Sequence, residues 1–363
     1  MTTHNIQIAK GFRWLGALMG VSFLALAACS QMMQPAAPTQ PAKAYVGLFK
    51  DNAVAVVDTG TNRVLRTIPI PAGPHGLVVT PDGRKVYVSS DGASTVSVID
   101  TAMDGVVASI EVGSTPHGLA ISADGSEVLV SGFGSNQAMI IDTATDRVVG
   151  RVPVAQPHNS AISPDGRTAY VGSQQQGAMA LVIVDLVKKV EAGRVPLDKT
   201  PRALDISPDG KWLYFTVAGA DAVQVLNTAT NKVVGQIPVG ASPHHPLFTP
   251  NGKSGLVVSQ GPGNLEILDP SSNTRSANVT VGKLLPHWIA VSSDGRTAYV
   301  TDEGSNDVSV VDLGGQKVTA TIPVGNAPRK IAVQPGPTAS TAGIALGGAP
   351  SNEQPRASLG AGY

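Results

Sequence analysis

One short segment recurs along most of this chain and limits its fold more than any other feature. In residues 116–125, PHGLAISADG, a Pro and an imidazole precede an apolar run and a tight turn. Near-copies begin at Pro74, Pro157, Pro201, Pro243 and Pro286, and a shortened copy begins at Pro328. Successive copies start 41 to 44 residues apart. A period in this range is typical of repeat architectures, so the fold has to be built from one unit used many times.

One repeat divides into four short strands. Residues 77–80, LVVT, are a strand that leads into a Thr-Pro-Asp-Gly turn, in which Pro presets φ, Asp bonds its own backbone and Gly takes the positive φ. Residues 85–89, 95–100 and 106–112 supply three more β-branched or alternating runs. The repeat is therefore predicted to be a small antiparallel meander.

Such a meander cannot bury both of its apolar faces alone, whereas radial stacking of several of them can, as in a β-propeller. Residues 44–70 contain three strands without a Pro-His strand before them, and residues 329–334 are a lone first strand. Together they complete one blade. We therefore predict an all-β fold, a seven-bladed β-propeller of four-stranded antiparallel blades whose C-terminal strand pairs with the N-terminal blade and closes the ring.

The repeat motifs resemble those of the YVTN family of propellers. The motifs are the strands AYVT (298–301) and VSVVD (308–312), the turn SPDG (207–210) and the closing run TIPVG (321–325). The resemblance covers residues 44–336 and implies the propeller fold. It does not imply a particular function.

The N-terminal segment is typical of an exported protein. Residues 1–28 have a polar start with two positive charges and an apolar core of about a dozen residues, which is a signal peptide rather than a membrane span. The ending Leu-Ala-Ala-Cys resembles the bacterial lipobox, which implies that Cys29 is lipidated, and Ser30 after it implies the outer membrane. Residues 29–43 are predicted to be a flexible tether and residues 337–363 a disordered tail. We expect a periplasmic, lipid-anchored monomer.

The bulk composition excludes some functions. Lys and Arg together number 26, as do Asp and Glu, so no basic excess exists for nucleic acid. The single cysteine excludes an intrachain disulfide. No nucleophile elbow, phosphate loop, zinc-protease helix or CxxC occurs. The acids repeated in each blade are expected to be turn formers.

The residue after each Pro is the main candidate for chemistry. Because it opens the innermost strand of each blade, one side chain per blade should reach a shared channel mouth. The seven residues in this register are His75, His117, His158, Arg202, His244, His287 and Arg329, and His245 is an extra neighbour. Trp288 is expected to floor a pocket there or to fill the funnel. Asp205 replaces a small apolar residue and should pair with Arg202.

Three interpretations of this ring remain open from sequence alone. The polar residue caps the inner strand and bonds to the next blade; or the ring binds an anion through its arginines; or imidazoles His75, His117, His158, His244 and His287 bind a metal such as copper, zinc or iron. The ring is similar to the propeller of nitrous oxide reductase, which builds a copper cluster from imidazoles, although this chain lacks that enzyme's cysteine-bearing domain.

Variable loops between the second and third strands open on the same face, as binding loops on a rigid scaffold do. Residues 90–92 form one such loop, and Asp302 and Glu303 are expected to be solvated loop charges or hard-oxygen ligands. We therefore expect a propeller that binds a protein partner or a small, anionic ligand at its mouth. The alternatives are a metal-binding or metal-dependent enzyme, like the lactone-hydrolysing and lyase propellers, and a structural adhesion module.

Overall fold

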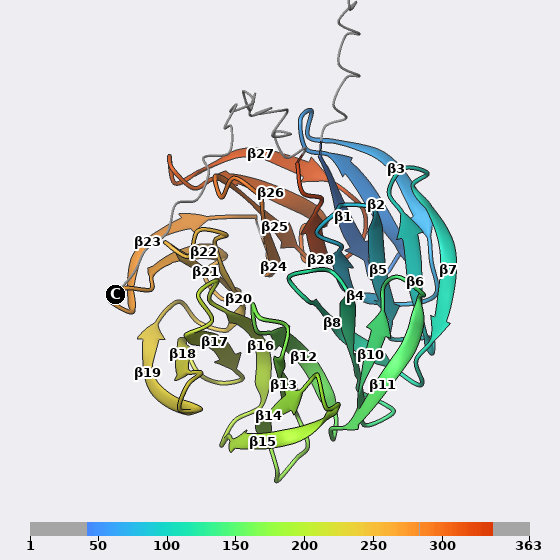
Figure 1. The fold of residues 1–363 in the computed structure, drawn as a ribbon. Helices are drawn as coiled ribbons and strands as arrows, with labels where there is room; N and C mark the ends of the chain where they lie inside the picture. Colours follow the sequence, from blue (N-terminus) through green and yellow to red (C-terminus); the bar gives the residue numbers. More distant parts are fainter. Residues whose placement is uncertain (1–41, 283, 337–363) are drawn as a thin grey trace, which may run out of the picture. The chain divides into compact units, whose positions relative to one another are not determined.

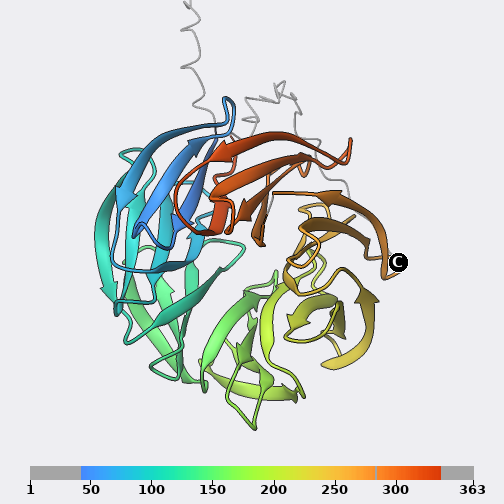
Figure 2. The same ribbon diagram turned by 180° about the vertical axis from the view of Figure 1, so that it is seen from behind.

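The computed structural model describes residues 42–282 and 284–336, which form seven four-stranded antiparallel sheets. The sheets are arranged around a common axis (Figures 1 and 2). The predicted all-β, seven-bladed propeller is therefore confirmed. Among the described residues, no helix has the length and apolar character needed to cross a bilayer. The predicted signal peptide and disordered tail, and all but the last two residues of the predicted tether, lie outside the described residues.

Each sheet has an inner, a second, a third and an outer strand. Sheet A contains, in that order, β28 (Pro328–Val333), β1 (Lys43–Leu48), β2 (Ala53–Asp58) and β3 (Arg63–Pro69). Sheet B contains β4 (Pro74–Val79), β5 (Lys85–Ser90), β6 (Thr95–Asp100) and β7 (Gly105–Glu111). Sheet C contains β8 (Pro116–Ile121), β9 (Glu127–Gly132), β10 (Gln137–Asp142) and β11 (Arg147–Pro153). Sheet D contains β12 (Pro157–Ile162), β13 (Thr168–Ser173), β14 (Ala180–Asp185) and β15 (Val190–Pro196).

The remaining three sheets repeat the pattern. Sheet E contains β16 (Pro201–Ile206), β17 (Trp212–Val217), β18 (Ala222–Asn227) and β19 (Lys232–Pro238). Sheet F contains β20 (Pro243–Phe248), β21 (Gly255–Ser259), β22 (Asn264–Asp269) and β23 (Thr274–Thr280). Sheet G contains β24 (Pro286–Val291), β25 (Thr297–Asp302), β26 (Asp307–Asp312) and β27 (Lys317–Pro323).

Sheet A closes the ring as predicted, because its inner strand comes from the other end of the propeller sequence. β28 pairs antiparallel with β1, and Val46 lies opposite Ile331. The Gln334 N–H also donates to the Lys43 carbonyl at 2.7 Å. The pairing leaves no open gap between the first and the last repeat, so β1 is not left as a free sheet edge.

Apolar side chains fill every interface between neighbouring sheets. The described residues form seven buried clusters, one at each interface. Successive residues of one strand serve opposite interfaces: Tyr45 packs toward sheet B and Val46 toward sheet G, and both are fully buried. Strands that are apolar on both faces therefore find a partner on each side, which is the reason that the meander is stable only within the ring.

The repeated acids form turns, as predicted. Asp82 accepts hydrogen bonds from the Arg84 N–H at 3.0 Å and from the Thr80 hydroxyl at 2.6 Å. Asp100 accepts from two N–H groups of the following turn, each at 2.9 Å. Their hydrogen-bonding capacity is used locally.

Polar clasps join neighbouring sheets on the face that carries the hairpin turns. Between sheets A and B, the Lys43 amine lies 2.8 Å from an Asp104 carboxylate oxygen and donates to the Thr101 carbonyl at 2.8 Å. The Tyr45 hydroxyl donates to the same carboxylate at 2.9 Å. Lys85 forms the same clasp between sheets B and C, with its amine 2.8 Å from both Asp146 and the Thr143 carbonyl.

Replacing Asp104 with Asn should destabilise the ring. Asn tolerates the positive φ of this position. However, it leaves the Lys43 ammonium, whose side chain is only 11% exposed, without a counter-charge. We expect a loss of about 2–4 kcal/mol in the free energy of unfolding, measured by urea titration. Glu191→Gln, which breaks the exposed pair with Arg194, should cost less than about 0.5 kcal/mol. Equal losses would contradict this role for the clasp.

Candidate functional site

The predicted ring residues lie together because the inner strands are irregular where they begin. In each inner strand the pairing register with the second strand shifts beside the ring residue, for example between Pro74 and Leu77 and between Pro116 and Leu119. The same shift occurs in the other five inner strands. A bulge of this kind re-aims a side chain. It turns one residue per blade toward the axis at one end of the ring, and this end, which carries the ring residues, is called the channel mouth below.

The imidazoles form two stacks. The ring centroids of His75 and His117 are 3.6 Å apart, and those of His117 and His158 are 4.1 Å apart. His244 and His287 form the second stack at 4.2 Å, and His75 lies 6.4 Å from His287. The five predicted imidazoles are therefore brought into one cluster.

Bonds to the neighbouring blade orient several of these rings. The Nδ1 of His117 is 3.2 Å from the His158 carbonyl, and the Nδ1 of His287 is 2.9 Å from the Arg329 carbonyl. A carbonyl only accepts, so Nδ1 carries the proton and Nε2 keeps its lone pair. His158 is also 2.9 Å from a carbonyl, that of Arg202, and equally far from the Asn159 amide nitrogen. The expected capping bond to the next blade is thus present, and it leaves Nε2 of His117 and His287 available as a ligand atom.

Burial keeps the cluster neutral. It lowers the pKa of His75, His117, His244 and His287 well below the usual value, and neighbouring positive charges add to the effect. For His158 burial lowers the pKa to about 4. The cluster is therefore a set of unprotonated imidazoles at neutral pH, which is the form that binds metals.

Two loop carboxylates approach the cluster in different ways. Asp91, from the β5–β6 loop, has one oxygen 3.9 Å from Nε2 of His117, and its other oxygen is buried without a hydrogen-bond partner among the described residues. Burial raises the Asp91 pKa to about 7. Glu303, from the β25–β26 loop, lies equally far from Nε2 of His287 but also accepts from the Arg329 guanidinium at 3.0 Å. Only Asp91 lacks a close cationic partner.

Both ring arginines are held by protein groups. Besides Glu303, the Arg329 guanidinium carbon lies 3.6 Å above the Phe49 ring. Arg202 donates to the Ser242 hydroxyl at 3.1 Å. Protein groups therefore fix the position of both guanidinium groups through one nitrogen of each.

A second polar layer lies one residue further along the inner strands. The amine of Lys330, a residue only 2% exposed, donates to Asn159 on β12 at 3.0 Å and lies 2.8 Å from the centre of a Trp288 ring. Trp288 in turn stacks on His245, with centroids 3.4 Å apart. Because β28 and β12 belong to sheets A and D, this layer spans the axis. Burial lowers the Lys330 pKa well below its usual value.

Sequence reasoning missed Lys330 and the special position of Asp91. Lys330 was detectable, because the other repeats have Gly76, Gly118, Asn159, Ala203, His245 and Trp288 in this register, and a lysine stands out among them. Asp91 gave no such signal, since its loop has no fixed pattern.

Two expectations were wrong. Asp205 does not pair with Arg202; it accepts from the Phe248 N–H at 2.7 Å, and burial raises its pKa to about 7. A backbone donor of the next sheet is closer than the guanidinium, which turns to Ser242. Asp302 is not a solvated charge, because it is fully buried and accepts from the Ser309 hydroxyl at 2.7 Å.

The neutral imidazoles should make the protein sensitive to acid. An unfolded histidine has a pKa of about 6.5, so below that pH the unfolded chain binds more protons than the folded one, and stability falls as the pH falls toward 4. Asp91, Asp205 and Asp302, with pKa values raised to about 7, act in the opposite sense. We expect His244→Gln to flatten the decrease of the unfolding midpoint between pH 6.5 and 4, measured by thermal scans. An unchanged slope would contradict burial of a neutral His244.

Comparisons with known proteins agree with this fold. The YNCE-like beta-propeller family model matches residues 42–123. A search of curated proteins gave no match. Hydrazine synthase of Kuenenia stuttgartiensis is similar in structure, with a TM-score of 0.68 and 22% identity over 78% of this chain and 98% of the other.

Two further solved structures are similar. A functionally unknown protein from Desulfotomaculum acetoxidans has a TM-score of 0.69 and 15% identity, over 81% of this chain and 99% of the other. The dihydro-heme d1 dehydrogenase NirN, solved in complex with DHE, has a TM-score of 0.61 and 18% identity, over 81% of this chain and 66% of NirN. At these identities the likeness concerns the fold. The chain is a seven-bladed β-propeller whose first repeats match the YNCE-like propeller model.

Proposed function

We propose that this protein is a binding propeller and that the mouth of its channel binds a divalent transition metal through His75, Asp91 and His117. One ligand atom from each of these residues lies within 4.8 Å of the other two. Ligand atoms around a tetrahedral metal are about 3.3 Å apart when each bond is about 2.0 Å. The ligand atoms therefore need to approach one another by at most about 1.5 Å.

The unpartnered Asp91 carboxylate carries the proposal. One Asp91 oxygen and Nδ1 of His75 are buried without hydrogen-bond partners in the described part of the chain. Buried polar atoms in this state are costly unless something binds them. A cation bound between them would remove this cost, and it would also stabilise Asp91 in its charged form.

The orientation of His117 gives further support. Metal-binding histidines usually donate their second ring N–H to a carbonyl or carboxylate, which fixes the ring. His117 makes this bond to the His158 carbonyl and directs Nε2 toward Asp91. Two imidazoles and a carboxylate suit zinc, iron or another divalent transition metal.

The anion hypothesis has weaker support. An imidazole whose Nδ1 proton goes to a backbone carbonyl presents a lone pair at Nε2, so it cannot donate to an anion unless it is protonated, and burial opposes protonation. Arg202 and Arg329 are already bonded to Ser242 and Glu303. We retain a small ligand as a partner of the metal, because three protein ligands leave a coordination position open. The same open position favours the alternative of a metal-dependent enzyme.

We further propose that the protein is exported, lipidated at Cys29 and anchored to the outer membrane as a monomer that does not bind nucleic acid. The first described strand, β1, starts on the face of the hairpin turns, where Lys43 clasps Asp104. The metal ligands lie at the opposite ends of the strands. An anchor on the N-terminal side would therefore leave the channel mouth accessible to a ligand or protein partner.

Metal binding can be measured with zinc or cobalt on protein that has been purified and dialysed against chelator. We expect one equivalent to bind by calorimetry. Because loss of an outer-sphere partner already costs 10–100-fold in affinity, Asp91→Asn and His75→Ala should each weaken binding by more than about 100-fold.

His287→Ala is the matched control. His287 has the same distance of 3.9 Å to a carboxylate, but that carboxylate is bonded to Arg329. We expect the control to retain native metal affinity within about threefold. Native protein without bound metal, or equal losses in all three variants, would refute a site at Asp91.

Lipidation gives a separate test. In a bacterial host, the native chain should incorporate labelled palmitate and partition into the detergent phase of Triton X-114, whereas Cys29→Ser should do neither. The fold and the metal affinity of the variant should be native, because Cys29 precedes the propeller. Equal labelling of both chains would contradict the proposal.

A further inference from the structure

The interface between sheets D and E lacks the lysine that completes the clasps of the first two interfaces. Lys43 and Lys85 begin the second strands of sheets A and B; the corresponding residue at the start of β13 is Thr168. The tyrosine of the clasp is conserved in position as Tyr170, and the acid of the next sheet is replaced by Asn231. The tyrosine is therefore in place and an amide oxygen stands where the clasps of Lys43 and Lys85 have a carboxylate, while the amine is absent.

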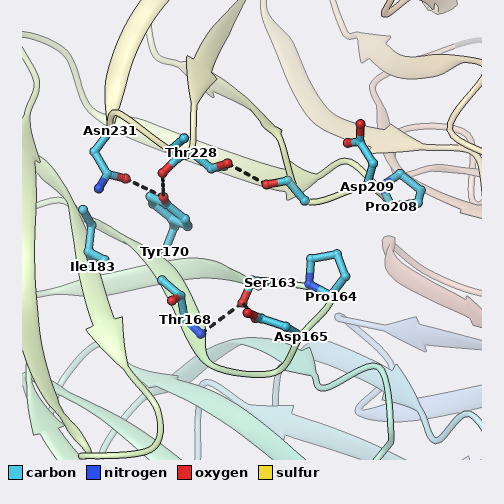
Figure 3. Close-up of a pocket in the computed structure, with 12 residues that line it drawn as sticks. Ser163, Pro164, Asp165, Thr168, Tyr170, Ile183, Pro208, Asp209, Thr228 and Asn231 are labelled. Carbon is cyan, nitrogen blue, oxygen red and sulfur yellow. Dashed lines mark hydrogen bonds between the residues drawn. The ribbon is translucent and has the colours of Figure 1, made fainter.

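A pocket of about 450 Å³ lies where the amine would be. Figure 3 shows Tyr170 and Asn231 at one end of it, with Thr168, Ser163 and Asp165 along one side and Thr228 and Asp209 along the other. The Tyr170 hydroxyl donates to the Asn231 side-chain oxygen, and the Thr228 carbonyl is 3.5 Å from that hydroxyl. The carbonyl and amide oxygens still have free lone pairs for a further donor.

Pockets at two other interfaces do not reach the corresponding tyrosine. Between sheets B and C a pocket of about 390 Å³ is lined by Lys85 but not by Tyr87 or Asp146. Between sheets E and F a pocket of about 480 Å³ is lined by Trp212 but not by Tyr214 or Asn273. The side chain at the start of the second strand therefore covers the tyrosine in both cases. Thr168 is too short to do so.

The charges around the pocket suit a cation. Asp165 and Asp209 accept hydrogen bonds from Ser163 and Ser207, and these bonds lower their pKa, so both carboxylates are ionised at neutral pH. Asp209 is partly neutralised by Lys211 at 3.1 Å. Asp165 has no ion-pair partner within 4 Å among the described residues.

We propose that the pocket between sheets D and E binds a primary ammonium group, in the position that the amines of Lys43 and Lys85 occupy at the first two interfaces. The Thr228 carbonyl would accept a hydrogen bond from the ammonium group, as the Thr101 and Thr143 carbonyls accept from the two lysines. The Asn231 side-chain oxygen would accept a second one, in the place of the Asp104 and Asp146 carboxylates. The ligand is either a free diamine or the lysine side chain of a protein partner. The site lies on the face opposite the channel mouth and is independent of the metal site.

Titration of cadaverine and of N-acetyl-lysine methylamide, followed by the backbone NMR signals of Thr168 and Asn231, tests the proposal. We expect saturable binding of both at millimolar or lower concentration and no binding of tetramethylammonium, which has no N–H donor. Tighter binding of the lysine derivative than of cadaverine identifies a protein partner as the source, and the reverse identifies a free diamine.

Two variants should remove the site by different routes. Thr168→Lys places an amine of the chain itself in the pocket and should weaken cadaverine binding at least tenfold. Asn231→Gly removes the amide oxygen while tolerating the positive φ of 54° at this position, and it should have a similar effect. If either folded variant binds as the native protein does, the assignment is wrong.

Lys85→Thr is the matched control, because it recreates the same vacancy beside Asp146. It should gain a second binding site for cadaverine and regain thermal stability when the amine is added. Binding to Lys85→Thr at the new site alone would show that an empty clasp binds amines but that the pocket between sheets D and E does not. Absence of binding at both sites would reject the ammonium interpretation altogether.

Discussion

The pairing of β28 with β1 is the constraint on which the other features depend. It completes sheet A from the two ends of the propeller sequence and places the seventh apolar cluster between sheets G and A. Without it, the faces of sheets A and G would each lose an apolar partner. The same strand brings Arg329 and Lys330 to the axis. Stability of the ring and assembly of the channel mouth are therefore one event.

The channel mouth buries polar groups, which costs folding free energy, and the apolar packing of the surrounding sheets offsets this cost. Five ring imidazoles, His245 and Lys330 are buried at this end of the axis, and burial shifts the pKa of each toward the neutral form. A propeller built for stability alone would place small apolar residues here, as it does further along the inner strands. Hydroxyl groups on the second strands support the arrangement: Ser89 accepts from the N–H of Gly76, and Thr301 accepts from that of Trp288. At the bulges the inner strands lose backbone hydrogen bonds to the second strands, and these hydroxyl groups accept from N–H groups that would otherwise be unpaired.

The period of the repeat was sufficient to predict the blades, their strands and the closure, because these follow from local apolar alternation and from counting. It was also sufficient to gather the ring residues, since equal register implies equal height on the axis. The period of the repeat could not predict contacts that cross the axis or that depend on the shape of a single loop. The bond from Lys330 to Asn159 joins residues 171 positions apart, and the approach of Asp91 to His117 depends on the shape of one loop. The predicted pairing of Asp205 with Arg202 was wrong for the same reason, because the actual donor is the Phe248 N–H of the next sheet, 43 positions away in the sequence.

Repetition itself offers a way to recognise function in this molecule. Where most blades share a residue, the residue forms a turn or packs, as Asp82 and Tyr45 do. Where blades differ, a polar atom without a partner or an open space indicates what one blade lacks relative to another. Asp91 departs from Glu303 by lacking an arginine, and Thr168 departs from Lys43 and Lys85 by lacking an amine. In each case the more complete repeat acts as an internal reference that indicates what is missing: a positive charge beside Asp91 and an ammonium group above Tyr170. Both departures call for a cation, and they lie on opposite faces of a protein whose formal net charge is zero.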